Sequence, residues 1–335
     1  MNTSIEPLRF TPLLKRIRWG GRRLGTRLGK PIGPESDYAE SWEIVDHGVD
    51  QSVVADGPWK KRSLGELVRE EPTRLLGRHA GLSTFPLLVK FLDANDRLSV
   101  QVHPNDEQAP RYVPGERGKT EAWIIMEADP GSCVFAGLKP GVDRKEMERA
   151  IRAGEVEECL HRLPVRVGDC VFIPAGTVHA LGEGVLLAEV QQSSDVTFRL
   201  FDWNRLGTDG KPRPLHIEQS LECINYSRGP VAAAVPIVER TVGGVRIERL
   251  ASCPYFTLRR YEGSGEITRA TENRCAVWIV LDGEIRWTRG PAAESTAGSI
   301  PPAATRGETL LWPAAATETQ VTFAPDTQVV EAFWE

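Results

Sequence analysis

At 335 residues the chain is longer than most single-core proteins, so we expect two domains, or one large domain with an appendage. The formal net charge of -5 argues against general binding to nucleic acids, and a phosphorylated ligand would need a local basic site. No signal peptide is evident, no apolar run approaches about 18 residues, and the six cysteines form no C-x-x-C pair. We therefore expect a cytoplasmic protein with reduced thiols and no membrane contact.

The N-terminal part of the chain changes its pattern at about residue 63. Residues 1–62 are rich in Arg, Gly and Pro, which favours short strands joined by turns. Over residues 63–80 leucines recur at roughly helical spacing, and Ser63 with Glu66 three positions later forms a capping-box pattern. This segment is predicted to form one helix or two short ones.

A buried strand is predicted next, directly before the most informative stretch of the sequence. Residues 85–92 (FPLLVKFL) form a continuous apolar run that only Lys90 interrupts, which is typical of a strand covered on both faces. The segment 98–122 follows it and carries a cluster of polar residues of the kinds that bind metals and anions.

Two pairs of polar residues in this segment should point into one cavity. Successive strand residues face opposite sides, so Gln101 and His103 share a face, and Lys119 and Glu121 share another. A histidine and a carboxylate suit Zn²⁺ or a similar divalent ion, and a glutamine amide oxygen can add a neutral ligand. A further ligand must come from elsewhere in the chain.

That further ligand is suggested by residues 168–182 (GDCVFIPAGTVHALG), where turns at Gly and Pro flank a short strand. The pattern G-x5-P-x-G-x2-H closely resembles the second motif of the cupins, small β-barrels that hold a metal inside a jelly roll. This resemblance implies that His179 faces the same cavity as Gln101, His103 and Glu121. The first cupin motif is altered, with Gln101 in place of its first histidine and an insertion before Glu121.

The following strands add two more candidates and then a boundary. Glu189 lies on a strand of alternating character and Arg199 on the strand after it. Glu189 could instead be a solvated strand residue, and Arg199 a structural partner of Asp195 or Asp202. Residues 206–236 are rich in Gly, Pro and Ala. We place a domain boundary there, which divides the chain into 1–235 and 236–335.

The C-terminal part is again predicted to be β-rich and carries no histidine after His216. The expected strands cover 246–250, 255–261, 277–287 and 329–334, and residues 288–305 should form a long surface loop. The expected fold is therefore mainly β: two cupin-type jelly-roll barrels, with metal ligands only in the N-terminal one, and a few peripheral helices.

Taken together, the motifs resemble one family, the type I mannose-6-phosphate isomerases in their shorter bacterial form. The carrying segments are WGGRRLG at 19–25, AESWEI at 39–44, FPLLVKFLDANDRLSVQVHP at 85–104, GKTEAW at 118–123, PAGTVHAL at 174–181 and EVQQSSDVTFRLFDW at 189–203. Transferred residue by residue, the resemblance implies one Zn²⁺ per chain with the ligands Gln101, His103, Glu121 and His179. It also implies the active-site residues Lys119, Glu189 and Arg199.

The resemblance implies reversible conversion of mannose 6-phosphate to fructose 6-phosphate through a cis-enediol. Because Glu121 is committed to the metal, Glu189 is the first choice for the proton-transfer base, with metal-bound water or a neighbouring lysine as rivals. Arg199 and Lys119 would hold the phosphate or the developing negative charge. The expected partner is a small sugar phosphate, and the expected assembly is a monomer or a weak homodimer.

Two alternatives come from other functional classes. A cupin dioxygenase would use a redox-active iron, but the glutamine ligand and the phosphate-suited cations argue against it. A sugar-phosphate sensor built on an inactive cupin should have lost metal ligands or Glu189, and this chain retains them.

Overall fold

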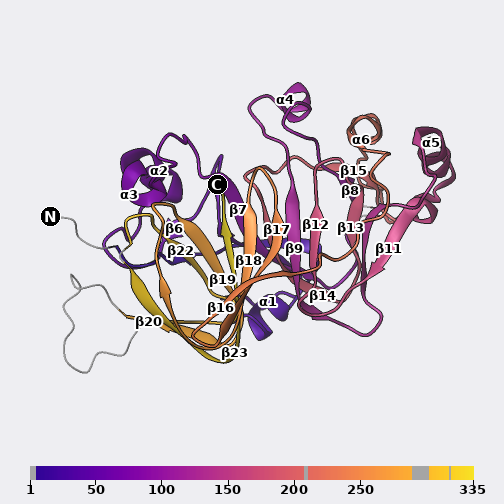
Figure 1. Ribbon diagram of the computed structural model, residues 1–335. Helices are drawn as coiled ribbons and strands as arrows, with labels where there is room; N and C mark the ends of the chain where they lie inside the picture. Colours follow the sequence, from indigo (N-terminus) through magenta and orange to yellow (C-terminus); the bar gives the residue numbers. More distant parts are fainter. Residues whose placement is uncertain (1–4, 207–209, 289–301, 317) are drawn as a thin grey trace.

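The structure, a computed structural model, describes residues 5–206, 210–288, 302–316 and 318–335. It is mainly β with a few short helices, as expected from the sequence (Figure 1). The helices are α1 (Arg23–Thr26), α2 (Leu64–Glu70), α3 (Pro72–Leu76), α4 (Ala109–Tyr112), α5 (Arg144–Ala153) and α6 (Ile217–Cys223), with a 3-10 turn at Val156–Cys159.

Two antiparallel sheets of the N-terminal half carry most of the predicted site residues, while His103 directly follows β8 and Lys119 lies two residues before β9. The six-stranded sheet has the order β12 (Cys170–Ile173), β9 (Glu121–Ala128), β14 (Val185–Gln192), β7 (Leu87–Ala94), β3 (Tyr38–Ile44) and β2 (Leu13–Gly21). The five-stranded sheet has the order β11 (Leu160–Pro164), β10 (Cys133–Leu138), β13 (His179–Leu181), β8 (Val100–Val102) and β15 (Phe198–Phe201).

The C-terminal half forms a third sheet. Its order is β16 (Ile237–Val242), β17 (Val245–Ser252), β18 (Thr257–Arg269), β23 (Thr319–Phe333), β19 (Ala276–Asp282) and β22 (Thr309–Trp312), with β20 (Glu284–Trp287) and β21 (Ala303–Thr305) attached beside β23. Short ribbons pair β1 (Phe10–Thr11) with β6 (Val53–Val54) and β4 (Asp46–His47) with β5 (Asp50–Gln51). The expected surface loop over 288–305 lies largely outside the described residues, and it was wrong at its end, where residues 303–305 form β21 paired with β20.

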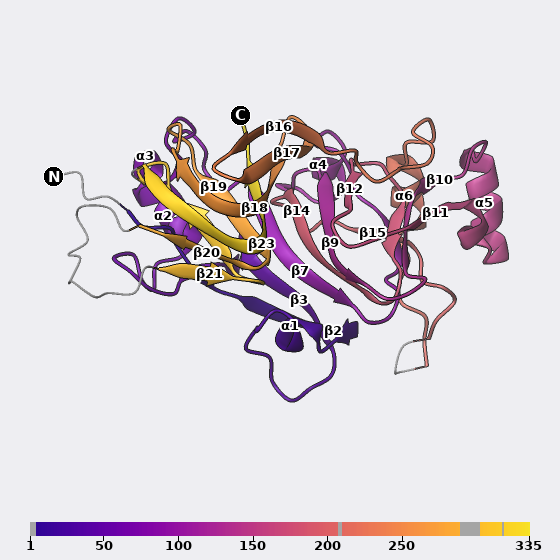
Figure 2. The ribbon, with the colours of Figure 1, turned by 60° about the horizontal axis from the view of Figure 1, so that its bottom comes forward.

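The three sheets form layers, and a separate apolar cluster lies between each pair of neighbouring sheets. Leu92 and Trp123 of the six-stranded sheet share one cluster with Val134 of the five-stranded sheet, so these two sheets pack face to face. On the opposite side of the six-stranded sheet, Phe91 shares a cluster with Val330 of the C-terminal sheet. Figure 2 accordingly shows β7 and β3 between β18 and β23 of the C-terminal sheet and β15 of the five-stranded sheet.

This layering explains the long apolar run in β7. Every residue of β7 is buried because one face meets the five-stranded sheet and the other meets the C-terminal core. The core therefore extends across the proposed boundary at residues 235 and 236. The division into two domains and the two jelly-roll barrels stay predictions.

The helices are peripheral. Ser63 caps α2 through the expected capping box with Glu66, and α3 follows immediately. Helix α5 packs Met147 and Ala150 against the outer face of the five-stranded sheet, in a cluster that also holds Leu221 of α6. Within the described ranges, each helix is too short or too polar to span a lipid bilayer.

Candidate metal centre and substrate cavity

A cavity of about 230 Å³ lies between the two N-terminal sheets. It brings together all the site residues predicted from the sequence, namely Gln101, His103, Lys119, Glu121, His179, Glu189 and Arg199. The remaining lining includes Trp19, Glu40, Lys90, Trp123, Asp195 and Thr197. Polar and charged side chains thus gather between two apolar sheet faces, where unpaired charges are costly unless they serve a ligand.

Strand register accounts for this convergence. In the five-stranded sheet, Gln101 of β8 lies opposite His179 on β13 and opposite Arg199 on β15. In the six-stranded sheet, Glu189 of β14 lies opposite Lys90 on β7 and opposite Trp123 on β9. Facing sheets therefore deliver the two sets of side chains from opposite walls of the cavity.

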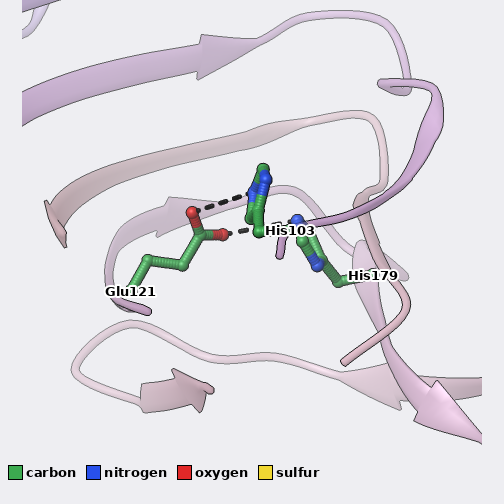
Figure 3. A group of neighbouring side chains, drawn as sticks. All are labelled: His103, Glu121 and His179. Carbon is green, nitrogen blue, oxygen red and sulfur yellow. Dashed lines mark ion pairs between the residues drawn. The ribbon is translucent and has the colours of Figure 1, made fainter. Parts of the chain in front are cut away.

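Three of the predicted metal ligands form a compact, buried group (Figure 3). Nε2 of His103 lies 3.3 Å from Oε2 of Glu121, and Nε2 of His179 lies 3.4 Å from Oε1 of the same carboxylate. The candidate ligand atoms all lie within 4.8 Å of one another, and the three residues are between 1% and 3% exposed. Both histidines thus point their outer ring nitrogen at one carboxylate.

Backbone carbonyls orient the two imidazoles. Nδ1 of His103 lies 2.9 Å from the Val196 carbonyl oxygen, and Nδ1 of His179 lies 2.9 Å from that of Thr177. A carbonyl oxygen only accepts, so each Nδ1 donates and a neutral ring carries its lone pair on Nε2. This second hydrogen bond is the usual way in which a protein fixes a metal-binding histidine.

The protonation states fit a cation at this place. Burial and the nearby Lys119 lower the pKa of His103 to about 3, and burial lowers the pKa of His179, so both rings are neutral. Burial alone would raise the pKa of Glu121, but Lys119 and the two histidines hold it well below its usual value. Nε2 of His103 and Oε2 of Glu121 are buried without an aligned hydrogen bond. Lone pairs that face each other in this way fit a divalent ion between them.

The expected fourth ligand, Gln101, occupies the same cavity. Its Nε2 donates to Oγ of Ser99 at 3.2 Å, and its amide oxygen is the atom of this side chain that could bind a metal. A donor set of two imidazoles, a carboxylate and an amide oxygen suits zinc or a similar divalent ion.

Glu189 lies in a second buried charge group, beside the histidine cluster. Its Oε2 accepts a hydrogen bond from Nε1 of Trp123 at 2.9 Å, and its Oε1 lies 3.1 Å from Nζ of Lys90. Lys90 also pairs with Glu40 at 3.3 Å, and Glu40 accepts from Nε1 of Trp42 at 2.6 Å. The group holds two carboxylates for one lysine.

This arrangement perturbs the acid-base properties of Glu189. Burial and the neighbouring Glu121 raise the pKa of Glu189, although Lys90 opposes that shift. For Lys90, burial disfavours the charge, but Glu189 and Glu40 outweigh burial and raise the pKa. A buried carboxyl group with a raised pKa, beside a cluster of metal-ligand type, has the properties of a general base.

Comparisons with known proteins agree with this chemistry. Residues 8–137 match the family model described as the catalytic domain of type I phosphomannose isomerase. The mannose-6-phosphate isomerase of Streptococcus mutans is 38% identical over 285 residues, which cover 85% of this chain and 88% of the relative. The chain belongs to the type I phosphomannose isomerase family.

Further members of the family support this conclusion. Mannose-6-phosphate isomerase ManA of Bacillus subtilis is 38% identical over 287 residues, covering 86% of this chain and 89% of the relative. The crystal structure of the mannose 6-phosphate isomerase from Bacillus subtilis matches the fold with a TM-score of 0.87 at 28% identity, covering 98% of this chain and all of that one (100%). The likeness therefore includes the C-terminal sheet, where the sequence resemblance is weak.

Arg199 lies at the cavity without a carboxylate partner in the described part of the chain. Its Nε donates to Oγ of Ser99 at 3.3 Å and its Nη1 to the Pro214 carbonyl at 3.0 Å. Asp202, one of the two partners considered from the sequence, instead pairs with Arg205 and Arg213, each at 2.7 Å. The Arg199 guanidinium thus keeps its charge available to a ligand in the cavity.

The sequence analysis did not identify Glu40 or Lys90 as residues of this cavity. The local signal for Lys90 was its position inside an apolar strand, where a lysine needs a buried partner. Glu40 gave a weaker signal, since a glutamate in a short N-terminal strand is usually exposed. Only the pairing of β3 with β7 brings it to Lys90.

Proposed function

We propose that this chain interconverts mannose 6-phosphate and fructose 6-phosphate through a cis-enediol, with one Zn²⁺ held by Gln101, His103, Glu121 and His179. The observation that carries the proposal is the buried cluster of His103, Glu121 and His179, which faces a cavity that is also lined by Glu189, Lys119 and Arg199. Together these elements can support isomerisation through an enediol: a metal polarises the substrate oxygens, a carboxylate moves the proton and cations hold the negative charge.

The bound zinc ion would act as a Lewis acid that polarises the substrate oxygens at C1 and C2. The ligand set supports this use because it contains only one carboxylate. Two neutral imidazoles and a neutral amide leave about one unit of positive charge at the site for a developing oxyanion.

Glu189 is proposed to move the proton between C1 and C2. Its raised pKa brings it nearer the operating pH, and the Trp123 and Lys90 contacts fix both carboxylate oxygens. Proton removal and return on one face of a planar enediol require a single base held rigidly above it. Glu121 is unsuited to this role because both of its oxygens face histidine nitrogens.

Lys119 and Arg199 are proposed to have different roles because they occupy different positions in the cavity. Nζ of Lys119 lies 3.1 Å from Oε2 of Glu121 and is buried, so it is placed beside the reacting carbons and the charge that develops there. Arg199 is half-buried and lacks a carboxylate partner among the described residues, so it is placed to hold the phosphate through a two-pronged contact.

Replacing Arg199 by lysine is expected to raise the KM for mannose 6-phosphate roughly tenfold, with a much smaller change in kcat. A lysine keeps the charge but loses the paired N–H groups that fit a phosphate. Steady-state kinetics of Arg199→Lys measures this effect. The control is Arg213→Lys, the same change at an arginine that is paired with Asp202. A KM equal to that of the parent protein would remove Arg199 from phosphate binding.

The proposed reaction is tested by turning over mannose 6-phosphate in deuterium oxide and examining the fructose 6-phosphate by NMR. Proton transfer through an enediol predicts solvent deuterium at C1 of the product, because the base exchanges its proton with water. Product that stays free of deuterium after many turnovers, when even a shielded base would have exchanged its proton with solvent, would favour direct hydride transfer and contradict the enediol. Tight sugar-phosphate binding without turnover, in folded and zinc-loaded protein, would favour the sensor alternative.

A further inference from the structure

A single carboxylate, Asp106, ties together the backbone segment that leads into Lys119. Its Oδ1 accepts hydrogen bonds from the Gly118 amide at 2.8 Å and from Nε2 of Gln192 at 3.1 Å. Its Oδ2 accepts a hydrogen bond from the Tyr255 hydroxyl at 2.6 Å. Tyr255 belongs to the C-terminal half, in the turn between β17 and β18. One side chain of the third sheet therefore reaches the segment beside the cavity.

The same network encloses Lys119 on both sides. The Lys119 amide donates to the Pro104 carbonyl at 3.0 Å, just before Asp106 in the chain. On the other side, Thr120 exchanges hydrogen bonds with Gln192: its amide donates to Oε1 at 2.9 Å, and its carbonyl accepts from the Gln192 amide at 3.1 Å. The hydroxyl of Thr120 accepts from the Ala175 amide at 3.2 Å, in the turn that precedes the second histidine of the cluster. These bonds leave Lys119 little backbone freedom.

The backbone at Asp106 packs tightly against the backbone at Gly118, so a shift of Asp106 should also move Lys119. A Cβ atom added at Gly118 would lie 2.6 Å from the backbone nitrogen of Asp106, so the two residues are already in close backbone contact. Burial and the neighbouring Asp106 raise the pKa of Tyr255 to about 12, so its hydroxyl stays a donor near neutral pH. No cation pairs with Asp106 among the described residues, which leaves these neutral donors to hold its charge.

We propose that Tyr255, acting through Asp106, is a positioning residue for Lys119, so that the C-terminal sheet contributes to the geometry of the reaction. This inference rests on the proposed role of Lys119 beside the developing charge. It gives the C-terminal half, none of whose described residues lines the cavity, a specific link to the reaction. A misplacement of about 1 Å at such a group is sufficient to cost a large factor in rate.

Tyr255→Phe tests the inference, because it removes only the hydroxyl. We expect kcat to fall roughly tenfold with KM little changed, and we expect faster amide hydrogen exchange over residues 104–121. The matched control is Tyr261→Phe, whose hydroxyl donates to Glu331 inside the C-terminal sheet at 3.0 Å. The control should lower thermal stability but leave kcat and exchange in 104–121 unchanged. Unchanged kcat or unchanged exchange in Tyr255→Phe would overturn the inference.

A double-mutant cycle with Lys119→Met separates this inference from the proposed role of Lys119. If Tyr255 acts through Lys119, Tyr255→Phe should have less than a twofold further effect on kcat once Lys119 is absent. The same tenfold loss in both backgrounds would overturn positioning through Lys119 while leaving the role of Lys119 intact. Full activity in Lys119→Met alone would instead show that the proposed role of Lys119 is wrong.

Discussion

Metal removal is expected to lower the turnover of mannose 6-phosphate by roughly a thousandfold or more, and added zinc should restore it. The reason is that Lewis-acid stabilisation of a developing oxyanion contributes several kcal/mol, and each 1.36 kcal/mol corresponds to a factor of ten in rate. His179→Ala should produce the same loss without a chelator, because it removes one of two imidazole donors from a buried cluster. Kinetic assays before chelation, after chelation and after zinc addition measure this effect directly.

The matched control for this experiment is His161→Ala, on β11. His161 is a partly exposed histidine outside the cavity, so its removal should leave both the metal content and the activity unchanged. Metal analysis of both variants by plasma mass spectrometry separates lost metal from lost catalysis. Full turnover by metal-free protein would contradict the role assigned to His103, Glu121 and His179.

Part of the cluster could be predicted from local signals, whereas His179 was assigned to the same cavity only through the resemblance of residues 168–182 to a cupin motif. Alternation along a strand places Gln101 and His103 on one face, and the valines on either side of Gln101 pack into the core on the other side. The turn residues before His179 similarly fix where that strand starts. Alternation of residues within one strand is sufficient to predict which of its side chains share a face.

Contacts set by strand order were beyond the reach of local patterns. Lys90 and Glu40 are 50 residues apart, and they meet only because β3 pairs with β7 in one particular register. A one-residue slip would send Glu40 to the opposite face of the sheet. The sequence indicates a strand at each place but does not specify which strands become neighbours.

The packing of the C-terminal half against the N-terminal half could likewise not be predicted from the sequence. The predicted strands of the C-terminal half overlap observed strands but often miss their bounds: 246–250 lies within β17, 277–287 is divided into β19 and β20, and 329–334 covers only the end of β23. The apolar residues that join this half to β7 look like ordinary strand residues, and a tyrosine in a turn shows no sign of its distant carboxylate partner. Packing between sheets and the Tyr255 to Asp106 bond depend on the full three-dimensional arrangement.

The other large effect is expected for Glu189→Gln, which should lower kcat by about 10² to 10⁴ while the protein stays folded and binds its metal. Glutamine has nearly the shape of glutamate and can still accept a hydrogen bond from Trp123, but it cannot take a proton from carbon. One buried negative charge is lost beside Lys90, which still has Glu40 as a partner. The substitution therefore removes the base and leaves the surrounding charge group in place.

Glu183→Gln is the matched control, since it makes the same chemical change at an exposed position in the turn before β14. Its kcat should equal that of the parent protein. Deuterium wash-in at C2 of mannose 6-phosphate adds a readout that a purely structural defect would not change selectively. Loss of wash-in together with retained metal and retained substrate binding would identify Glu189 as the proton carrier. Wash-in at the parental rate in Glu189→Gln would instead transfer that role to another group in the cavity.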